Sequence, residues 1–251
     1  MSRCNPVVAT VPRTSTVVGM LLIGSGSLVK YAITYATDLG IKIDLVCTEN
    51  DASLEKFCGR LDVPFMKLFD INKQHQQVLN SSTDGLAFSI NNSSILSDEI
   101  LSTDVQFFNI HNGLVQKYRG IAEVCVMAAI CKSEVIYGST LHRLLPGQEV
   151  DAGPIISQRA VNLISDESFE SVFTKSIENY KQLLHSTFSD LSELCYSKGS
   201  YEHGENIYSY KHVKQLLNEA PPDRRILAAH LGKYTGLLPR LANSLKSVDG
   251  N

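Results

Sequence analysis

The fold is decided by the run Val17-Val18-Gly19-Met20-Leu21-Leu22-Ile23 and by Gly24-Ser25-Gly26-Ser27, which follows it directly. A short apolar run of this kind is typical of a buried strand, and the glycines are typical of a tight turn. Leu28 to Leu39 has helical spacing and stops at Gly40, a residue that often ends helices. This segment therefore predicts one strand–turn–helix unit.

Strand and helix signals go on alternating through the first half of the chain. The further strands are expected at Ile41–Cys47, Val63–Leu68, Leu86–Ile90 and Val105–Ile110, with helices at Ala52–Leu61 and Asn72–Leu79. Such alternation indicates a mostly parallel sheet with helices on both faces and right-handed crossovers. The predicted class is α/β.

The second half has a different pattern, with fewer strands and more helix. We expect a helix at Ile121–Cys131, strands at Val135–Arg143 and Pro154–Val161, and a long helix that opens at Ser165-Asp166-Glu167 and carries an apolar stripe to Leu194. Three helices then follow, at Lys211–Leu217, Arg224–Leu231 and Leu237–Leu245, the last two beyond the Pro221-Pro222 break. The predicted organisation is a flexible N-terminus (1–16), a main domain (17–200) and a helical C-terminal extension (201–251). The sequence leaves open whether the extension packs on the main domain or forms a subunit contact.

Composition excludes several classes of function. The 251 residues carry a formal net charge of −3, which gives no basic footprint for nucleic acid. The chain has no run of roughly 18 apolar residues, so we expect no membrane helix, and Pro6 and Pro12 make the N-terminus a poor signal peptide. The six cysteines are scattered, without a CxxC pair or a histidine at metal spacing: Cys4, Cys47, Cys58, Cys125, Cys131 and Cys195. Free thiols in the cytoplasm and no metal site are the expectation.

The turn Gly24-Ser25-Gly26 invites comparison with a dinucleotide-binding loop. The third glycine of GxGxxG is missing, because Val29 stands in its place, and the chain has no Walker loop. We therefore interpret the glycines as a tight turn between strand and helix.

The chemistry-bearing residues lie between Phe108 and Ile156. Asn109 and His111 are two apart on a predicted strand, so both side chains point to one side at its C-terminal end, where parallel sheets bind ligands. The turn Asn112-Gly113 follows, and Asp151 stands further along, two residues before Gly153. An amide can stabilise the oxygen of a tetrahedral intermediate, an imidazole can move protons, and a carboxylate can fix the imidazole tautomer. These groups suit acyl transfer to an amine without a covalent enzyme intermediate.

Two motifs in this region resemble the folate-dependent formyltransferase family, which includes glycinamide ribonucleotide transformylase, methionyl-tRNA formyltransferase and sugar N-formyltransferases. Asn109 through Gly120 is similar to N-x-H-x-S-L-L-P-x-[YF]-[RK]-G, and Gly138 through Ile156 to G-x-T-x-H followed by D-x-G-x-I-I. Ser93-Ser94-Ile95-Leu96-Ser97 resembles the family's Ile-Leu loop, whose backbone receives the pterin ring.

The resemblance implies a Rossmann-like formyltransferase fold and 10-formyltetrahydrofolate as the formyl donor. The site residues that it implies are Asn109, His111 and Asp151 for catalysis, Ser94, Ile95, Leu96, Gln148, Glu149 and Val150 for the folate, and Thr140 and His142 as support. Two alternatives stay open for Tyr118 and Arg119: they shape the acceptor side, or they cap the helix that follows.

The chain also departs from the family pattern. Val115-Gln116 replaces the usual Leu-Pro, which predicts a less rigid loop after His111, and the interval from His142 to Asp151 is two residues longer than in many relatives. The tail has little likeness to the C-terminal barrel of the tRNA-directed enzymes. With the acidic charge, this argues against tRNA as acceptor, and segments such as Leu144-Leu145-Pro146-Gly147 are nearer to assembly-line and sugar N-formyltransferases.

The function expected from the sequence is formyl transfer to an amine of a small biosynthetic intermediate. The acceptor class stays open among an amino sugar, an amino acid, a hydroxyamine and a carrier-bound group. A carrier protein and a second copy of the chain are open as partners. Two rivals also stay open: a hydrolase of the same donor, and a folate- or partner-binding module that has lost catalysis.

Overall fold

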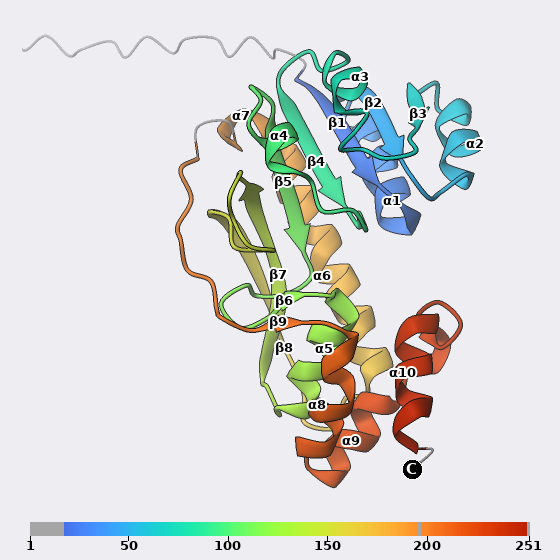
Figure 1. Cartoon of the computed structure of the whole chain (residues 1–251), viewed down its shortest axis with the longest axis vertical. Helices are drawn as coiled ribbons and strands as arrows, with labels where there is room; N and C mark the ends of the chain where they lie inside the picture. The colour runs from blue at the N-terminus through green and yellow to red at the C-terminus, as the bar shows by residue number, and fades with distance from the viewer. Residues whose placement is uncertain (1–17, 195–196, 250–251) are drawn as a thin grey trace, which may run out of the picture.

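The computed structural model describes residues 18–194 and 197–249 (Figure 1). The predicted flexible N-terminus, 1–16, lies outside the described residues. The main sheet has seven strands in the order β3-β2-β1-β4-β5-β7-β8. Its strands are β1 (Gly19–Gly24), β2 (Lys42–Thr48), β3 (Phe65–Lys67), β4 (Leu86–Ile90), β5 (Gln106–His111), β7 (Ile136–Leu144) and β8 (Ile155–Asn162).

The first five strands of this sheet are parallel, while β7 runs antiparallel to β5 and β8 antiparallel to β7. This confirms the mostly parallel α/β sheet. In the register of β5 and β7, Asn109 pairs with His142 and His111 with Thr140. Residues about 30 positions apart in the sequence are therefore neighbours at one end of the sheet.

Helices cover both faces of the sheet, as β1 illustrates. Met20 and Leu22 pack in one core with α1 (Gly26–Asp38), α2 (Ser53–Arg60) and α6 (Phe169–Ser189). Leu21 and Ile23 point the other way, into a second core below α3 (His75–Leu79) and α4 (Asp98–Leu101). All four side chains are almost completely buried, and each such burial contributes about 1.5–3 kcal/mol.

The long helix α6 begins later than the sequence predicted. Its N-cap is Ser168, whose side chain accepts a hydrogen bond from the Ser171 N–H, and the expectation of a start at Ser165 was wrong. The Glu167 carboxylate instead accepts from the Ile164 N–H and closes a turn before the helix. The helix ends at Ser189, and the apolar stripe continues in the short α7 (Leu191–Leu194).

The C-terminal extension packs against the main domain. Its helices α8 (Val213–Glu219), α9 (Pro222–Ala229) and α10 (Pro239–Asp249) form a third core with α5 (Ala122–Cys131) and the start of α6 (Figure 1). Helix α9 begins at Pro222, two residues before the predicted start, because proline is well suited to the first helical turn. Before these helices, β9 (Ile207–Tyr208) pairs in parallel with β6 (Arg119–Gly120). The extension is thus joined to the segment that follows β5.

Four of the six cysteines are free and buried, as expected: Cys47, Cys58, Cys125 and Cys131. Cys4 and Cys195 lie outside the described residues. Within residues 18–194 and 197–249, no helix has the length and apolar character needed to cross a membrane, and no group of three histidine, cysteine or acidic side chains is placed to hold a metal ion.

Candidate active site

The candidate site is built at the C-terminal end of β5. Asn109 and His111 come from this strand, His142 from β7, and Asp151 from the loop between β7 and β8. Asp151 has a backbone φ of 53°, a left-handed conformation that aspartate adopts more readily than most residues. Gly153 lets the loop lie on β7, since a Cβ there would stand 1.7 Å from the Arg143 carbonyl oxygen.

The predicted catalytic side chains converge around Asp151. Its Oδ2 lies 3.4 Å from His111 Nδ1 and accepts a 2.8 Å hydrogen bond from the Gly120 N–H. Its Oδ1 lies 3.4 Å from His142 Nε2 and 3.4 Å from Asn109 Nδ2. One carboxylate thus contacts an amide and two imidazoles. His142, predicted as support, belongs to the same cluster.

Burial strengthens the electrostatic coupling in this cluster. Burial alone would raise the pKa of Asp151, but His111, His142 and the Gly120 N–H outweigh it and hold the pKa of this carboxyl well below its usual value. Burial lowers the pKa of His111, while the Asp151 carboxylate opposes that change. The resting cluster therefore consists of an ionised carboxylate beside a largely neutral imidazole.

His111 has an acceptor near each ring nitrogen. Nε2 lies 2.9 Å from the Tyr118 carbonyl oxygen, and Nδ1 faces Asp151. A neutral ring can donate to one of these acceptors, whereas the imidazolium can donate to both. The surroundings of His111 are therefore arranged to receive a proton.

His142 and Asp151 control the orientation of the Asn109 amide. Asn109 Nδ2 lies 3.0 Å from His142 Nε2 and forms a longer, weaker bond to Asp151. Because the Asp151 contact is 3.4 Å long, this N–H can turn toward a developing oxyanion at small cost.

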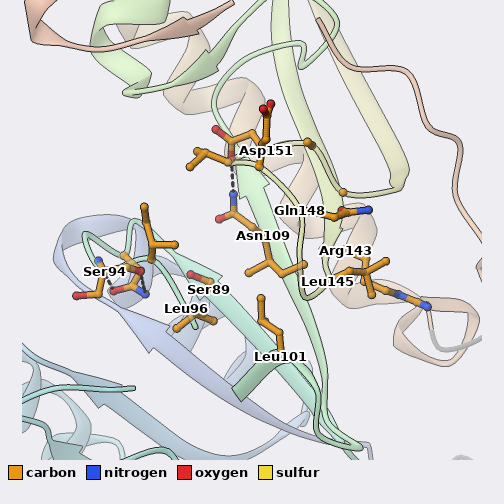
Figure 2. Close-up of a pocket in the computed structure, with 16 residues that line it drawn as sticks. Ser89, Ser94, Leu96, Leu101, Asn109, Arg143, Leu145, Gln148 and Asp151 are labelled. Carbon is orange, nitrogen blue, oxygen red and sulfur yellow. Dashed lines mark hydrogen bonds between the residues drawn. The ribbon is translucent and has the colours of Figure 1, made fainter. Parts of the chain in front are cut away.

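A pocket opens in front of this cluster (Figure 2). It spans about 670 Å³, including its opening to solvent. Asn109 and Asp151 line its inner end, and all six predicted folate-binding residues line it: Ser94, Ile95, Leu96, Gln148, Glu149 and Val150. His111 is not among the lining residues and lies behind Asp151, with 5 % of its surface exposed.

Several lining residues were not predicted from the sequence: Ser89, Asn92, Leu101, Arg143, Ala152 and Gly153. Ser89 pairs with Asn109 in the register of β4 and β5. The regular alternation of these neighbouring strands was the signal that could have identified it.

Tyr118 and Arg119, predicted to bind the acceptor, are both buried. The Tyr118 ring packs against Tyr137 and Tyr208, and the Arg119 guanidinium bonds within the protein. The geometry favours structural positions for both side chains over direct acceptor contact.

The loop after His111 is held by side chains of β7 and β8. Thr140 donates to the Gly113 carbonyl and accepts from the Val115 N–H. The amides of Gln116 and Gln158 pair reciprocally at 2.8 Å. These contacts tie the loop to β7 and β8 at the place where the family pattern has proline.

The family model described as "Formyl transferase" matches residues 70–187, which include β4, β5, β7, β8 and the whole side-chain cluster. Over these residues the chain is similar to formyl transferases. A methionyl-tRNA formyltransferase of Thermotoga neapolitana is 26 % identical over 178 residues, which are 66 % of this chain and 56 % of that protein. The chain thus spans about half the length of the curated relatives it matches.

Solved structures share the fold of this chain. A sugar N-formyltransferase from Shewanella sp. FDAARGOS_354 is 21 % identical with a TM-score of 0.65, covering 84 % of this chain and 86 % of that one. An N-formyltransferase from Helicobacter canadensis, solved with folinic acid and dTDP-3-aminofucose, is 16 % identical with a TM-score of 0.62 and coverages of 84 % and 80 %. A formyltetrahydrofolate deformylase from Pseudomonas syringae pv. tomato is 18 % identical with a TM-score of 0.62 and coverages of 71 % and 62 %. The predicted Rossmann-like fold is confirmed.

Proposed function

We propose that this protein transfers the formyl group of 10-formyltetrahydrofolate to an amine of a small acceptor by direct attack. One observation carries the proposal: the loops expected to hold the folate line a single pocket together with Asn109 and Asp151, two of the three residues expected to do the chemistry. Ser94–Leu96 and Gln148–Val150 form its walls, and Asn109 and Asp151 lie at its inner end.

In the proposed reaction the acceptor nitrogen attacks the formyl carbon and the carbonyl electron pair moves to oxygen. Asn109 donates an N–H to this oxyanion in the tetrahedral intermediate. Collapse of the intermediate breaks the bond to the folate nitrogen. That nitrogen gains the proton that the amine has lost, and the products are tetrahydrofolate and a formamide.

His111 takes up and returns the transferred proton. The two ring nitrogens of His111 face the Tyr118 carbonyl oxygen and the Asp151 carboxylate. The proton therefore reaches His111 from the side of Asp151, either directly or through a water molecule. Asp151 stays ionised because its pKa is low, and its charge stabilises the imidazolium. The Asp151 carboxylate therefore stabilises the positive charge on His111, and it does not hold a proton in the resting state.

Support for the folate donor comes from the shape and chemistry of the pocket. Its lining combines apolar side chains such as Ile95, Leu96 and Leu145 with polar groups such as Ser89 and Gln148. A flat heterocycle with hydrogen-bonding edges suits such a lining. The Helicobacter canadensis neighbour binds a reduced folate, which agrees with this choice.

The acceptor is proposed only as a class, a small amine that is an amino sugar, an amino acid or a hydroxyamine, free or bound to a carrier. The test is to incubate the protein with 10-formyltetrahydrofolate and a panel of such amines. The expected result is a mass gain of one formyl group together with release of tetrahydrofolate. Tight folate binding without turnover on any amine or on water would support the binding-module alternative instead.

Hydrolysis of the same donor is the second candidate, because one of the structural neighbours is a formyltetrahydrofolate deformylase. The same cluster could activate water. Formate release without amine, as fast as the amine-stimulated reaction, would favour this alternative.

A further inference from the structure

Arg119 is a fully buried arginine whose guanidinium links two distant segments of the chain. Its Nε donates to the Val150 carbonyl at 2.8 Å, and Nη2 donates to the Glu149 carboxylate at 2.8 Å. On its other side, Nη1 donates to the Gly204 carbonyl at 2.6 Å. Nη1 also lies 3.5 Å from His203 Nδ1. Glu149 and Val150 immediately precede Asp151, so two of these four contacts fall on the loop that carries the catalytic carboxylate.

The backbone beside Arg119 holds the same loop. The Gly120 N–H donates to Asp151 Oδ2 at 2.8 Å. Gly120 has a φ of 102°, and a Cβ there would lie 2.3 Å from the Tyr208 carbonyl oxygen, so β6 can approach β9 this closely only as glycine. The side chain of residue 119 and the backbone of residue 120 thus fasten residues 149–151 to the extension.

We propose that Arg119 is a positioning residue for formyl transfer, which ties the Asp151 loop to the C-terminal segment at Gly204. The proposal rests on the proposed function. A planar guanidinium can hold Val150, Glu149 and Gly204 at once, whereas a lysine ammonium at this place cannot reproduce the fork. Asp151 needs such support because its backbone is in the left-handed region and its charge must meet both imidazoles.

The charge of Arg119 gives a second, separable effect. Burial and the neighbouring His142 and Arg119 lower the pKa of His111, and Asp151 raises it. Removing the cation therefore raises the His111 pKa, and the acid limb of the pH profile moves to higher pH. Replacing arginine by lysine keeps the charge, so it alters the geometry while leaving the acid limb in place.

The test compares Arg119→Lys and Arg119→Met with the control Lys117→Met, which removes an exposed cation two residues away that pairs with Glu134. We expect both Arg119 variants to lower kcat about 10- to 100-fold, the usual effect of losing hydrogen bonds to a charged group. Only Arg119→Met should move the acid limb. Lys117→Met should keep the wild-type kcat and pH profile.

Gly204→Ala tests the other end of the link, because its Cβ would lie 2.3 Å from the Gln116 carbonyl oxygen and push the segment away. The expected result is a lower kcat with an unchanged acid limb. Folinic acid binding and the midpoint of thermal unfolding show whether each variant is folded. If Arg119→Met does not fold, the kcat of Arg119→Lys tests the positioning role.

A kcat of Arg119→Lys within twofold of wild type, with wild type active, overturns the positioning role alone. Absence of both formyl transfer and hydrolysis in the wild-type protein overturns the proposed function, and the positioning role with it.

Discussion

The inner end and the mouth of the pocket are built in different ways. The inner end combines strand residues with one tight loop. Asp151 in this loop is almost fully buried, and so are His111 and His142, which contact it. The mouth, where the pocket opens to solvent, is formed by loops. Ile95 in one of these loops has 74 % of its surface exposed. Sheet register fixes the inner end, whereas the mouth depends on loop conformation. We therefore expect the inner end to govern turnover and the mouth to govern affinity for the donor.

The largest expected effect is loss of the proton-transfer groups at the inner end. Asp151→Asn and His111→Asn should each lower kcat about 10²- to 10⁴-fold, the usual contribution of general acid–base catalysis. Asparagine tolerates the left-handed backbone at position 151, so the first variant removes the charge and keeps the loop. Steady-state rates with 10-formyltetrahydrofolate measure the effect, and folinic acid binding serves as the control. A near-normal rate in either variant would remove that residue from the mechanism.

The second effect concerns stability against acid. Because the pKa of Asp151 is lowered in the folded state, its contribution to the free energy of unfolding is present above the unfolded pKa of about 3.9 and is lost as the pH falls through the folded pKa. The contribution is on the order of 2 kcal/mol at pH 7. Urea unfolding of wild type and Asp151→Asn at pH 7, 5 and 3 should show a gap that narrows only at the lowest pH. A gap that does not change over this range contradicts the assignment.

A third, smaller effect is expected at His142. His142→Asn loses the imidazole contacts to Asn109 and Asp151, and we expect kcat to fall about tenfold, corresponding to one hydrogen bond to a charged group. The fall should be clearly smaller than that of His111→Asn, measured under the same conditions. Equal losses in the two variants would mean that His142, and not His111 alone, carries the proton.

The smallest effect lies at the mouth. Ile95→Ser removes apolar surface that the folate would cover, so the KM for the donor should rise about fivefold while kcat stays the same. Phe69→Ser is the matched control, since Phe69 is 89 % exposed and does not line the pocket. A fall in kcat for Ile95→Ser would show that mouth and inner end are not separate in function.

Much of the fold could be predicted from the sequence because its signals are local. The strand β1 and the helix after it follow from an apolar run, a glycine turn and helical spacing, and the observed bounds are close to the predicted ones. The start of α6 was predicted wrongly because two serines compete for the role of N-cap. Ser165 and Ser168 are both good N-caps, and only the Glu167 side chain, which bonds to Ile164, decides between them.

The candidate site was predictable in its members but not in its contacts. The spacing of Asn109 and His111 placed both at the end of β5, and the motif containing Asp151 supplied the carboxylate. The sequence did not indicate that Arg119 would turn inward, because side-chain direction at a strand of two residues depends on the segment that covers it. That segment, around Gly204, lies 85 residues away in the sequence.

The pairing of β6 with β9 has a consequence for the order in which the molecule is made. Ribosomal synthesis runs from the N-terminus, so the sheet and Asp151 emerge well before Gly204 and Tyr208. A nascent chain that ends soon after α6 contains the residues that line the pocket, but it lacks the Gly204 carbonyl to which Arg119 donates. The link between Arg119 and Gly204 therefore forms only after residues 204–208 have been made and have folded back against β6.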